Sequence, residues 1–243
     1  MANFFDFNNN FGPVEEESEL IPLMTSDDEE AILKESLPES VPILPLRNAV
    51  LFPGVVIPIS ATRDKSVKLI KNANSNNKLI GVVSQKDSNV SDPTINDVNK
   101  IGTVAKILRV LQMPDGNLTI IIQGKKRFSI DKLISETPFI TSSINELKEI
   151  SPKKDNKTFQ ATIDSIKDLA LKIIDENPNI PSEASFAIKN IHSNSFLVNF
   201  VSSNMNISVE EKFKILCIDD LQKRALRCLK FMDVEFQKLS LKN

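Results

Sequence analysis

The chain has 243 residues, of which 41% are hydrophobic, and its formal net charge at pH 7 is −2. This composition is that of a globular protein with one large domain or two smaller ones. No window approaches the roughly 18 consecutive apolar residues of a membrane-spanning helix. The acidic N-terminus also lacks the basic and apolar regions of a signal peptide. We therefore expect a cytoplasmic protein with no membrane partner.

Residues 1–40 carry most of the negative charge. They hold eleven acidic residues against one lysine, Lys34, for a net charge of −10. The rest of the chain has 29 basic and 21 acidic residues, a net charge of +8. A segment this acidic and this poor in apolar side chains cannot offset its chain entropy. We predict a disordered acidic tail over 1–40 and a folded part that starts near Val41.

Residues 41–150 have mostly β-strand character. Short apolar runs at 41–46, 50–60 and 79–85 predict strands, and the segment from Thr62 to about Asn74 predicts one helix with Thr62 as its N-cap. Three prolines, Pro45, Pro53 and Pro58, interrupt the first two runs. Because proline has no backbone N–H to donate, these strands must be short, kinked or at an edge.

The clearest β signal is a hairpin at residues 102–123. Its arms, 102–112 and 117–123, flank the turn-forming sequence Met113-Pro114-Asp115-Gly116. In the second arm Leu118, Ile120 and Ile122 alternate with other residues, as on the buried face of a strand. A second turn is expected at 124–126, followed by a strand at 127–134. The whole segment predicts a small curled antiparallel sheet or pseudo-barrel.

From residue 151 the apolar period becomes helical. Ser151-Pro152 has the residue types of an N-cap followed by the first helical position, and further helices are expected near 182–192, 195–203 and 208–217. Ser208 and Glu211 form a capping box, and the acidic pairs Glu210-Glu211 and Asp219-Asp220 suit helix N-termini. We predict a helical bundle over 151–219. Over 220–243 we predict the start of a long helix, whose apolar residues have coiled-coil spacing but are too few to exclude an ordinary amphipathic bundle helix.

The sequence offers little for catalysis or metal binding. Its six glycines are not spaced as a phosphate-binding loop or a dinucleotide fingerprint, and no G-x-S-x-G motif occurs. The single histidine, His192, excludes a multi-histidine metal site, and Cys217 and Cys228 have the features of ordinary thiols. A Ser–Lys dyad is possible by residue type alone, but no pattern places one. We predict no catalytic, cofactor-binding or metal-binding residues in this chain.

The run Lys125-Lys126-Arg127 raises the possibility of nucleic-acid binding. However, tryptophan and tyrosine are absent, so phenylalanine alone would have to supply the aromatic platform that single-strand binders use. A solvated hairpin turn is the simpler interpretation. We do not expect nucleic acid to be the main partner.

Several short blocks spread over residues 41–241 carry a family resemblance. The later ones are FLVNFVSSNMNISVEEK at 196–212 and the helix around Arg224, and Arg63 heads the first helix. The earlier matching pieces are Pro45-Leu46-Arg47-Asn48, Phe52-Pro53-Gly54, Pro58, Gly81, Gly102, Asp115-Gly116 and Gly124 with Arg127-Phe128. In this order they resemble the N-terminal, substrate-binding domain of the ATP-dependent protease Lon.

The resemblance implies an α+β fold, with a PUA-like antiparallel β pseudo-barrel and one helix over 41–150, then a helical bundle. It implies a region that binds unfolded or damaged polypeptides within a homohexameric ATP-dependent serine protease. The family's ATP- and Mg-binding module and its Ser–Lys peptidase dyad lie C-terminal to this region, and neither motif occurs here. We expect a fragment that stops inside the long helix. A stand-alone Lon-type domain acting as an RNA-binding or adaptor module is the alternative.

The substrate site of such a domain should consist of apolar side chains that the fold cannot bury. Val110, Leu111 and Met113 lie toward the Pro114–Gly116 turn, where a barrel is thin and burial is difficult. Met113 is the best single candidate, because its flexible thioether suits varied apolar partners. We predict these three as substrate-binding residues; the alternative is that they close the end of the barrel.

Overall fold

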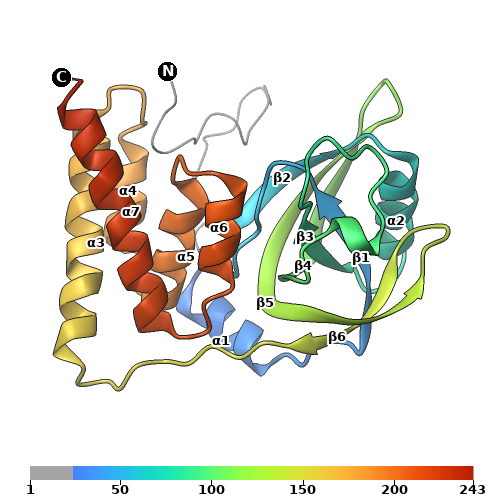
Figure 1. Cartoon of the computed structure of the whole chain (residues 1–243), viewed down its shortest axis with the longest axis horizontal. Coiled ribbons are helices and arrows are strands. Elements are labelled where there is room, and N and C mark those ends of the chain that lie inside the picture. Colours follow the sequence, from blue (N-terminus) through green and yellow to red (C-terminus); the bar gives the residue numbers. More distant parts are fainter. Residues whose placement is uncertain (1–23, 243) are drawn as a thin grey trace. The chain divides into compact units, whose positions relative to one another are not determined.

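A computed structural model of the chain describes residues 24–242, and residues 1–23 and 243 lie outside the described part. The described chain divides into a β unit, Asp27–Lys148, and a helical unit that starts at Glu149 (Figure 1). The predicted α+β class is therefore confirmed. Among residues 24–242 no helix is both long enough and apolar enough to cross a bilayer.

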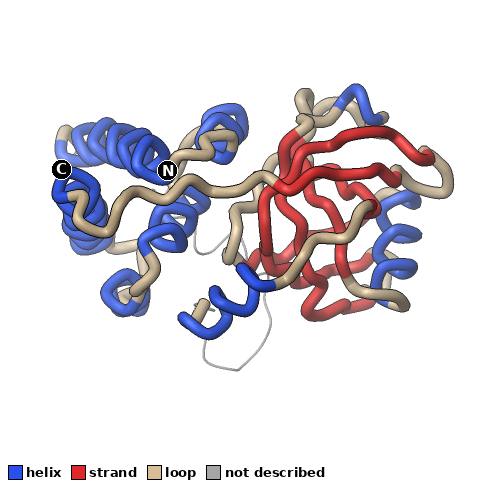
Figure 2. Tube along the Cα trace, turned by 90° about the horizontal axis from the view of Figure 1, so that it is seen from below, coloured by secondary structure: helices blue, strands red, loops and turns tan. Residues whose placement is uncertain are grey.

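Six strands form one sheet in the β unit, in the order β2-β5-β4-β3-β1-β6. Because β6 pairs with β5 as well as with β1, the sheet closes on itself, and β2 extends its edge (Figure 2). The pairs are antiparallel except β1 with β3, which the sequence did not predict to be parallel. The predicted pseudo-barrel is confirmed. The strands are β1 Ser40–Leu46, β2 Val56–Ala61, β3 Leu79–Ser84, β4 Ile101–Gln112, β5 Leu118–Ser135 and β6 Thr141–Glu146.

The parallel pair is possible because the connection from β1 to β3 is long. It contains β2 and then helix α2, Asp64–Asn74, and a parallel pair needs a crossover of this kind. Arg63, and not Thr62, occupies the N-cap position of α2, so the predicted cap is wrong by one residue. Between β3 and β4 lies a loop with a short 3-10 helix, Ile95–Asp97.

Strand β5 is 18 residues long and serves both halves of the barrel. Its first part pairs with β2, and its part from Phe128 onward pairs with β6. Between Gly124 and Arg127 strand β5 has one residue more than the facing part of β4: Gly124 pairs with Ala105, and Arg127 pairs with Thr103. An extra residue of this kind bends a strand and increases its twist. The predicted turn at 124–126 is therefore wrong, because the chain bends there inside one continuous strand.

The bend in β5 packs against a tight turn formed by Phe52, Pro53, Gly54 and Val55. Val55 N donates to Phe52 O at 3.2 Å, and Gly54 has a φ of +79°, as in a type II turn with proline before glycine. Gly54 N donates to Gly124 O, and Gly124 N donates to Val55 O, both at 2.9 Å. A Cβ on residue 124 would lie 2.3 Å from Phe52 O. The close approach of the two backbones therefore requires glycine at 124.

The prolines of the first two strands lie where no ladder donor is needed. Pro53 is in the turn just described, and Pro58 is in β2, which pairs only with β5. In β1, Ile43 N donates to Ile140 O on the β6 side. Backbone groups two residues apart in a strand point to the same side, so the nitrogen of Pro45 also points toward the β6 side. The paired residues of β1 and β6 end at Pro42, so no strand partner needs a donor from Pro45.

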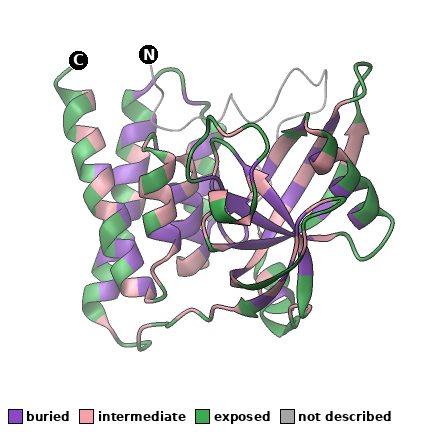
Figure 3. Cartoon of the chain, turned by 45° about the vertical axis from the view of Figure 1, so that its right-hand side comes forward, coloured by how far each residue is buried: buried purple, intermediate pink, exposed green. Residues whose placement is uncertain are grey.

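Buried residues lie along the strands of the β unit (Figure 3), and most of them are aliphatic. Leu118, Ile120 and Ile122 are at most 2% exposed, which confirms that they form the buried face of β5. One cluster of core residues at the β6 end comprises Val41, Ile43, Val83, Val98, Val104, Phe128, Ile140 and Ile144.

Helix α1, Ser26–Lys34, lies within the stretch predicted to be disordered. Ile32 is only 6% exposed, and Lys126 in β5 donates to the carbonyl oxygens of Leu33 and Glu35. The prediction of a disordered tail is therefore wrong for residues 26–34, because contacts more than 90 residues away in sequence hold them. The part of that prediction on residues 1–23 lies outside the described residues.

The helical unit contains helices that begin at polar caps. The side chains of Asn156, Ser193, Ser208 and Asp220 each accept a hydrogen bond from a backbone N–H three residues later. The capping box at Ser208 is confirmed, whereas α3 begins at Lys157 and not after Ser151 as predicted. The bounds are α3 Lys157–Glu176, α4 Glu183–Asn190, α5 Asn194–Asn204, α6 Val209–Leu216 and α7 Leu221–Ser240.

The segment before α3 is held against the start of α7. Ile150 N donates to Asp219 O at 2.9 Å, and Leu221 N donates to Ile150 O at 3.0 Å. One residue earlier, Glu149 Oε2 accepts a hydrogen bond from Arg224 Nη1 at 2.9 Å and from Ser195 Oγ at 2.7 Å. Beyond this pairing, Asn156 N donates to Lys153 O at 3.1 Å in a turn, and the Asn156 side chain caps α3, so the helix begins at Lys157.

Arg224 is the most deeply buried cation of the helical unit within residues 24–242, with 1% of its surface exposed. Besides Glu149, its Nη1 donates to Asn199 Oδ1 at 3.1 Å, and its Nε donates to Ile218 O at 3.1 Å. One guanidinium therefore joins α5, α7, the loop before α7 and the segment before α3.

Replacing Gly124 by alanine should destabilise the β unit by about 2–3 kcal/mol, because the new methyl group collides with the backbone of Phe52. Gly116→Ala is the matched control: its Cβ would meet open space, and only its φ of +85° opposes the change, which costs about 1–2 kcal/mol. Urea denaturation of both variants measures the difference. Equal losses would contradict the assigned role of Gly124.

Arg224→Ala should lower the free energy of unfolding by about 3–5 kcal/mol, because it leaves the partly buried carboxylate of Glu149 without its cation. Arg227→Ala removes the same charge from the exposed face of α7 and should cost less than about 1 kcal/mol. Thermal denaturation followed by circular dichroism compares the two. A small loss for Arg224→Ala would mean that the network contributes nothing to stability.

Candidate functional site

The hairpin between β4 and β5 projects from the β unit and ends in the predicted turn. Met113 N donates to Asn117 O at 2.9 Å, and Gly116 N donates to Met113 O at 3.0 Å. The Asp115 carboxylate accepts hydrogen bonds from the backbone and side-chain nitrogens of Asn117, at 3.0 and 2.9 Å. Gly116 has a positive φ that other residues rarely adopt. The turn is thus internally bonded and holds the ends of both strands.

The three residues predicted as a site lie along this hairpin but do not share one face. Met113 follows the last residue of β4 and is 43% exposed. Val110 lies opposite Ile120, on the face that carries the core, whereas Leu111 lies opposite Thr119, on the other face. Both are half-buried. The structure therefore brings Leu111 onto the outer face, leaves Met113 at the tip, and separates Val110 from them.

Leu108 is a second exposed apolar residue of this hairpin, which the sequence analysis missed. It is 49% exposed and is the extra residue of a β-bulge in β4. Ile107 pairs with Ile122 of β5, but the next pair is Arg109 with Ile121, so Leu108 has no partner residue in the register. The extra residue of such a bulge is not paired. The bulge also reverses which residues face the core. No local pattern marks it, because it depends on the pairing of two strands.

The outer face of the sheet beside the hairpin is also partly apolar. Pro58 of β2 lies opposite Ile121 of β5. Thr119 of β5 lies between Ser60 of β2 on one side and Leu111 of β4 on the other. Pro58, Ile121 and Leu111 are half-buried. Together with the exposed Leu108 and Met113, these residues form what we call the hairpin surface: Pro58, Leu108, Leu111, Met113 and Ile121.

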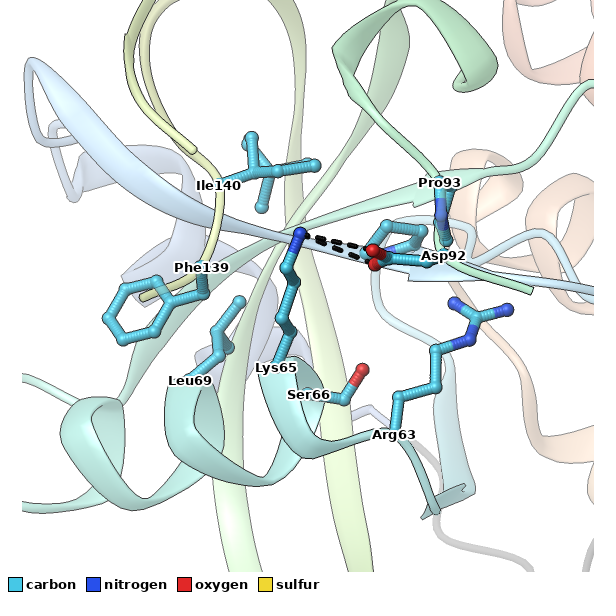
Figure 4. A pocket seen from close by; sticks show the side chains of 10 residues that line it. Arg63, Lys65, Ser66, Leu69, Asp92, Pro93, Phe139 and Ile140 are labelled. Carbon is cyan, nitrogen blue, oxygen red and sulfur yellow. Dashed lines mark hydrogen bonds and ion pairs between the residues drawn. The ribbon is translucent and has the colours of Figure 1, made fainter. Parts of the chain in front are cut away.

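A shallow depression lies beside the start of α2 (Figure 4). Leu69, Phe139 and Ile140 line one side, while Arg63, Lys65 and Asp92 lie toward the other. Lys65 Nζ is 3.3 Å from Asp92 Oδ1, an ion pair exposed to solvent. The charged groups at this depression are therefore largely engaged with one another.

Arg63 holds the loop between β3 and β4 through Gln85. The Arg63 guanidinium donates to Gln85 Oε1, and Gln85 Nε2 donates to the carbonyl oxygens of Asp87 and Val90, each at 3.0 Å. Partial burial and the nearby Arg47 lower the pKa of Arg63, while Asp92 acts in the opposite direction. These contacts account for Arg63 as a structural residue of the β unit.

The basic run at 125–127 is not a solvated turn, so that interpretation is wrong. Lys125 and Lys126 have side chains that are 12% and 16% exposed, and Arg127 is 3% exposed. Lys126 Nζ is 2.8 Å from Glu146 Oε1, and Lys125 Nζ is 3.9 Å from Glu35 Oε2. These cations lie in β5 and are paired within the β unit.

The described residues offer no evident reaction centre. No group of three or more His, Cys, Asp and Glu side chains within residues 24–242 is placed to hold a metal ion. His192 is exposed after α4. Burial raises the pKa of the Cys228 thiol to about 12, so that thiol stays protonated and unreactive at neutral pH.

Comparison with known proteins identifies relatives over nearly the whole described chain. The model of the "ATP-dependent protease La (LON) substrate-binding domain" family matches residues 40–234. A Lon protease from Flavobacterium johnsoniae is 63% identical over 227 residues, and one from Cytophaga hutchinsonii is 45% identical over 224 residues. These alignments cover 93% and 92% of this chain. The chain spans about 28% of the length of each of these relatives.

Solved structures with the same fold include two N-terminal domains of Lon-type proteins. The N-terminal domain of a Mycobacterium avium complex Lon protease matches with a TM-score of 0.66 and 19% identity, over 80% of this chain and 98% of that domain. A Lon N-terminal domain protein from Xanthomonas campestris matches with a TM-score of 0.54 and 13% identity, over 79% and 97% of the two chains. At these identities the likeness concerns the fold.

The family model covers both the closed β unit and most of the helical unit, and the fold agrees with it. The resemblance inferred from the spaced proline and glycine blocks is confirmed. The chain belongs to the family of substrate-binding domains of the ATP-dependent protease La (LON).

Proposed function

We propose that this chain is the substrate-recognition and assembly region of a Lon-type ATP-dependent protease. In this role it binds unfolded or damaged polypeptides and hands them to ATPase and peptidase modules that lie outside this chain. ATP, Mg and the Ser–Lys dyad belong to those modules. Family membership and the relatives' length, of which this chain spans about 28%, support the proposal. Self-association as a homohexamer and a cytoplasmic location follow from the family alone and form part of the proposal.

The observation that carries the proposal is the exposure of large apolar side chains on the hairpin surface. Unfolded polypeptides differ from folded ones in the apolar side chains they expose, so a general receptor needs apolar surface of its own. Leu108 and Met113 are 49% and 43% exposed, and both lie on the hairpin. Leu111, Ile121 and Pro58 extend this surface along the outer face. We propose that these side chains contact substrate.

The sheet geometry supports this use of the hairpin. The tip is fixed by the turn hydrogen bonds of Asp115 and Asn117, so Met113 is presented by a bonded framework. The bulge at Leu108 interrupts regular pairing and directs an extra leucine outward. A flexible thioether and a leucine adapt to many sequences, because dispersion contacts have no strict direction. Low sequence selectivity is what capture of varied unfolded chains requires.

An RNA-binding module is the rival function, and the packing of the basic run disfavours it. Phosphate recognition needs lysine and arginine side chains that are free to contact the backbone of the nucleic acid. Lys125 and Lys126 are mostly covered and paired with carboxylates and carbonyl oxygens, and Arg127 is buried. The basic run that suggested RNA binding is therefore engaged within the β unit.

Leu108→Asp together with Met113→Asp should weaken binding of a reduced, alkylated and permanently unfolded protein by at least about tenfold, since each side chain loses about 1 kcal/mol of apolar contact. Stability should change by about 0.5 kcal/mol or less per substitution, because both residues are exposed. Fluorescence anisotropy of the labelled unfolded protein measures the affinity.

Ile134→Asp is the matched control. Ile134 is 59% exposed at the far end of β5, so the same change in chemistry is made away from the hairpin surface. Its affinity for the unfolded protein should equal that of the wild type. The proposal is wrong if the hairpin variant binds normally, or if Ile134→Asp weakens binding equally.

Binding of the unfolded protein should change little between ~50 and ~200 mM salt, whereas nucleic-acid affinity falls steeply over this range. The same titrations with single-stranded and double-stranded RNA measure the rival function. We expect weak RNA binding and an affinity for unfolded protein that varies less than about threefold. Tight RNA binding with a steep salt dependence would favour the RNA-binding module instead.

A further inference from the structure

Helix α1 is a short acidic helix whose C-terminal end is bonded to Lys126 of β5. Its sequence SDDEEAILK has acidic residues at four of its first five positions, and it contains two large apolar residues, Ile32 and Leu33. Ile32 is 6% exposed, whereas Leu33 is 67% exposed. A nine-residue helix is marginal in water by itself. Its order here therefore depends on the surface on which it is docked.

Lys126 forms the polar part of that docking. Its Nζ lies 2.6 Å from the carbonyl oxygen of Glu35, 3.3 Å from that of Leu33 and 2.8 Å from Glu146 Oε1. The ammonium group donates a hydrogen bond to each carbonyl oxygen and forms an ion pair with the carboxylate, so three oxygens lie near it. Two of the three belong to α1 or the residue just beyond it. The side chain of Lys126 is 16% exposed, so these contacts replace most of its water.

The two carbonyl oxygens are those that a helix leaves unpaired at its C-terminus. They carry the negative end of the helix dipole, and a cation placed there is favourable. Lys125 adds a second positive charge, with Nζ 3.9 Å from Glu35 Oε2. Because the hydrogen bonds from Lys126 to Leu33 and Glu35 go to main-chain oxygens, the same arrangement fits the C-terminal end of other helices.

The register shift of β5 explains why two lysines in succession are present at this surface. Lys125 and Lys126 lie between Gly124 and Arg127, where three steps on β5 face two on β4. Regular strands direct successive side chains to opposite faces, but both lysines here reach Glu35 or its carbonyl oxygen. The bend that closes the barrel therefore also builds this cationic pair.

We propose that the surface around Lys125 and Lys126 is a binding site for acidic helical segments of polypeptides, and that α1 occupies it in cis. The ligand is an acidic segment with one apolar side chain, whose helix C-terminus lies over Lys126. The tether between α1 and β1 keeps α1 at a high effective concentration, so another segment binds only when α1 is displaced. This site is separate from the hairpin surface, and the proposal does not depend on the proposed function.

The test uses the full chain and a synthetic peptide of residues 24–36, acetylated and amidated at its ends. Ile32→Asp in the full chain removes the buried apolar side chain and should release α1. Leu33→Asp is the matched control, because the adjacent side chain is 67% exposed. Hydrogen exchange of the α1 amides should accelerate at least tenfold in Ile32→Asp, and should stay unchanged in Leu33→Asp.

The vacated site should then bind the peptide. We expect the Ile32→Asp chain to bind it at least tenfold more tightly than the wild-type or Leu33→Asp chain, measured by anisotropy of a labelled peptide. Adding Lys126→Ala to Ile32→Asp should abolish the gain. Adding Lys132→Ala should keep it, since Lys132 is an exposed lysine of the same strand.

Three results would overturn the proposal. The Ile32→Asp chain could bind the peptide no better than the wild type, or the gain could survive Lys126→Ala. The third is loss of protection in the barrel strands of the Ile32→Asp chain, which would make α1 an integral part of the fold and not a removable occupant. The hydrogen-exchange experiment reports on that third result directly, because it follows α1 and the strands of the β unit separately.

Discussion

The β unit depends on the bend of β5 at Gly124. One strand of 18 residues pairs with β2 at its start, with β4 along most of its length and with β6 at its end. It can do so only if it turns sharply without ending. The missing side chain at Gly124 lets the turn at Phe52–Val55 approach and exchange two backbone hydrogen bonds with it. The closed barrel, the projecting hairpin and the cationic pair at 125–126 all follow from this bend.

Local chemistry in the sequence predicted the elements whose signals are local. The Pro114-Asp115-Gly116 turn, the capping box at Ser208 and the alternation of Leu118, Ile120 and Ile122 all form as expected. The spaced proline and glycine blocks carried the family resemblance, because each residue meets a backbone requirement of this barrel. The division into a β part and a helical part could also be read from the change of apolar period.

The misses have nonlocal causes. Gly124-Lys125-Lys126 has the composition of a turn, but pairing with β2, β4 and β6 keeps the segment in one strand. Helix α3 starts later than Ser151 because a turn at residues 153–156 comes first and Asn156 supplies the cap, while Ile150 just before it pairs with Asp220, about 70 residues away. The candidate site remains a prediction: Met113 lies at an exposed tip, whereas Val110 and Leu111 lie on opposite faces because they are neighbours in one strand. The bulge at Leu108 decides which of the two faces the core. A bulge of this kind depends on the partner strand and leaves no mark in the sequence.

The two sites that we propose consist of apolar side chains and of a pair of cations. The buried charges are paired, the thiol of Cys228 is held protonated, and the large apolar side chains on the hairpin are available to a partner. Apolar contact and backbone-directed cations share one property, which is low selectivity for sequence. Both therefore suit the proposed role of binding many different polypeptides.

Mapping of backbone amide chemical shifts in the isotope-labelled chain, titrated with an unfolded protein, tests the account most directly. The account predicts that the affected amides cluster at residues 108–121 and at Pro58's neighbours in β2, on the outer face of the sheet. Shifts confined to helices α3–α7, or to the depression beside α2, would contradict it.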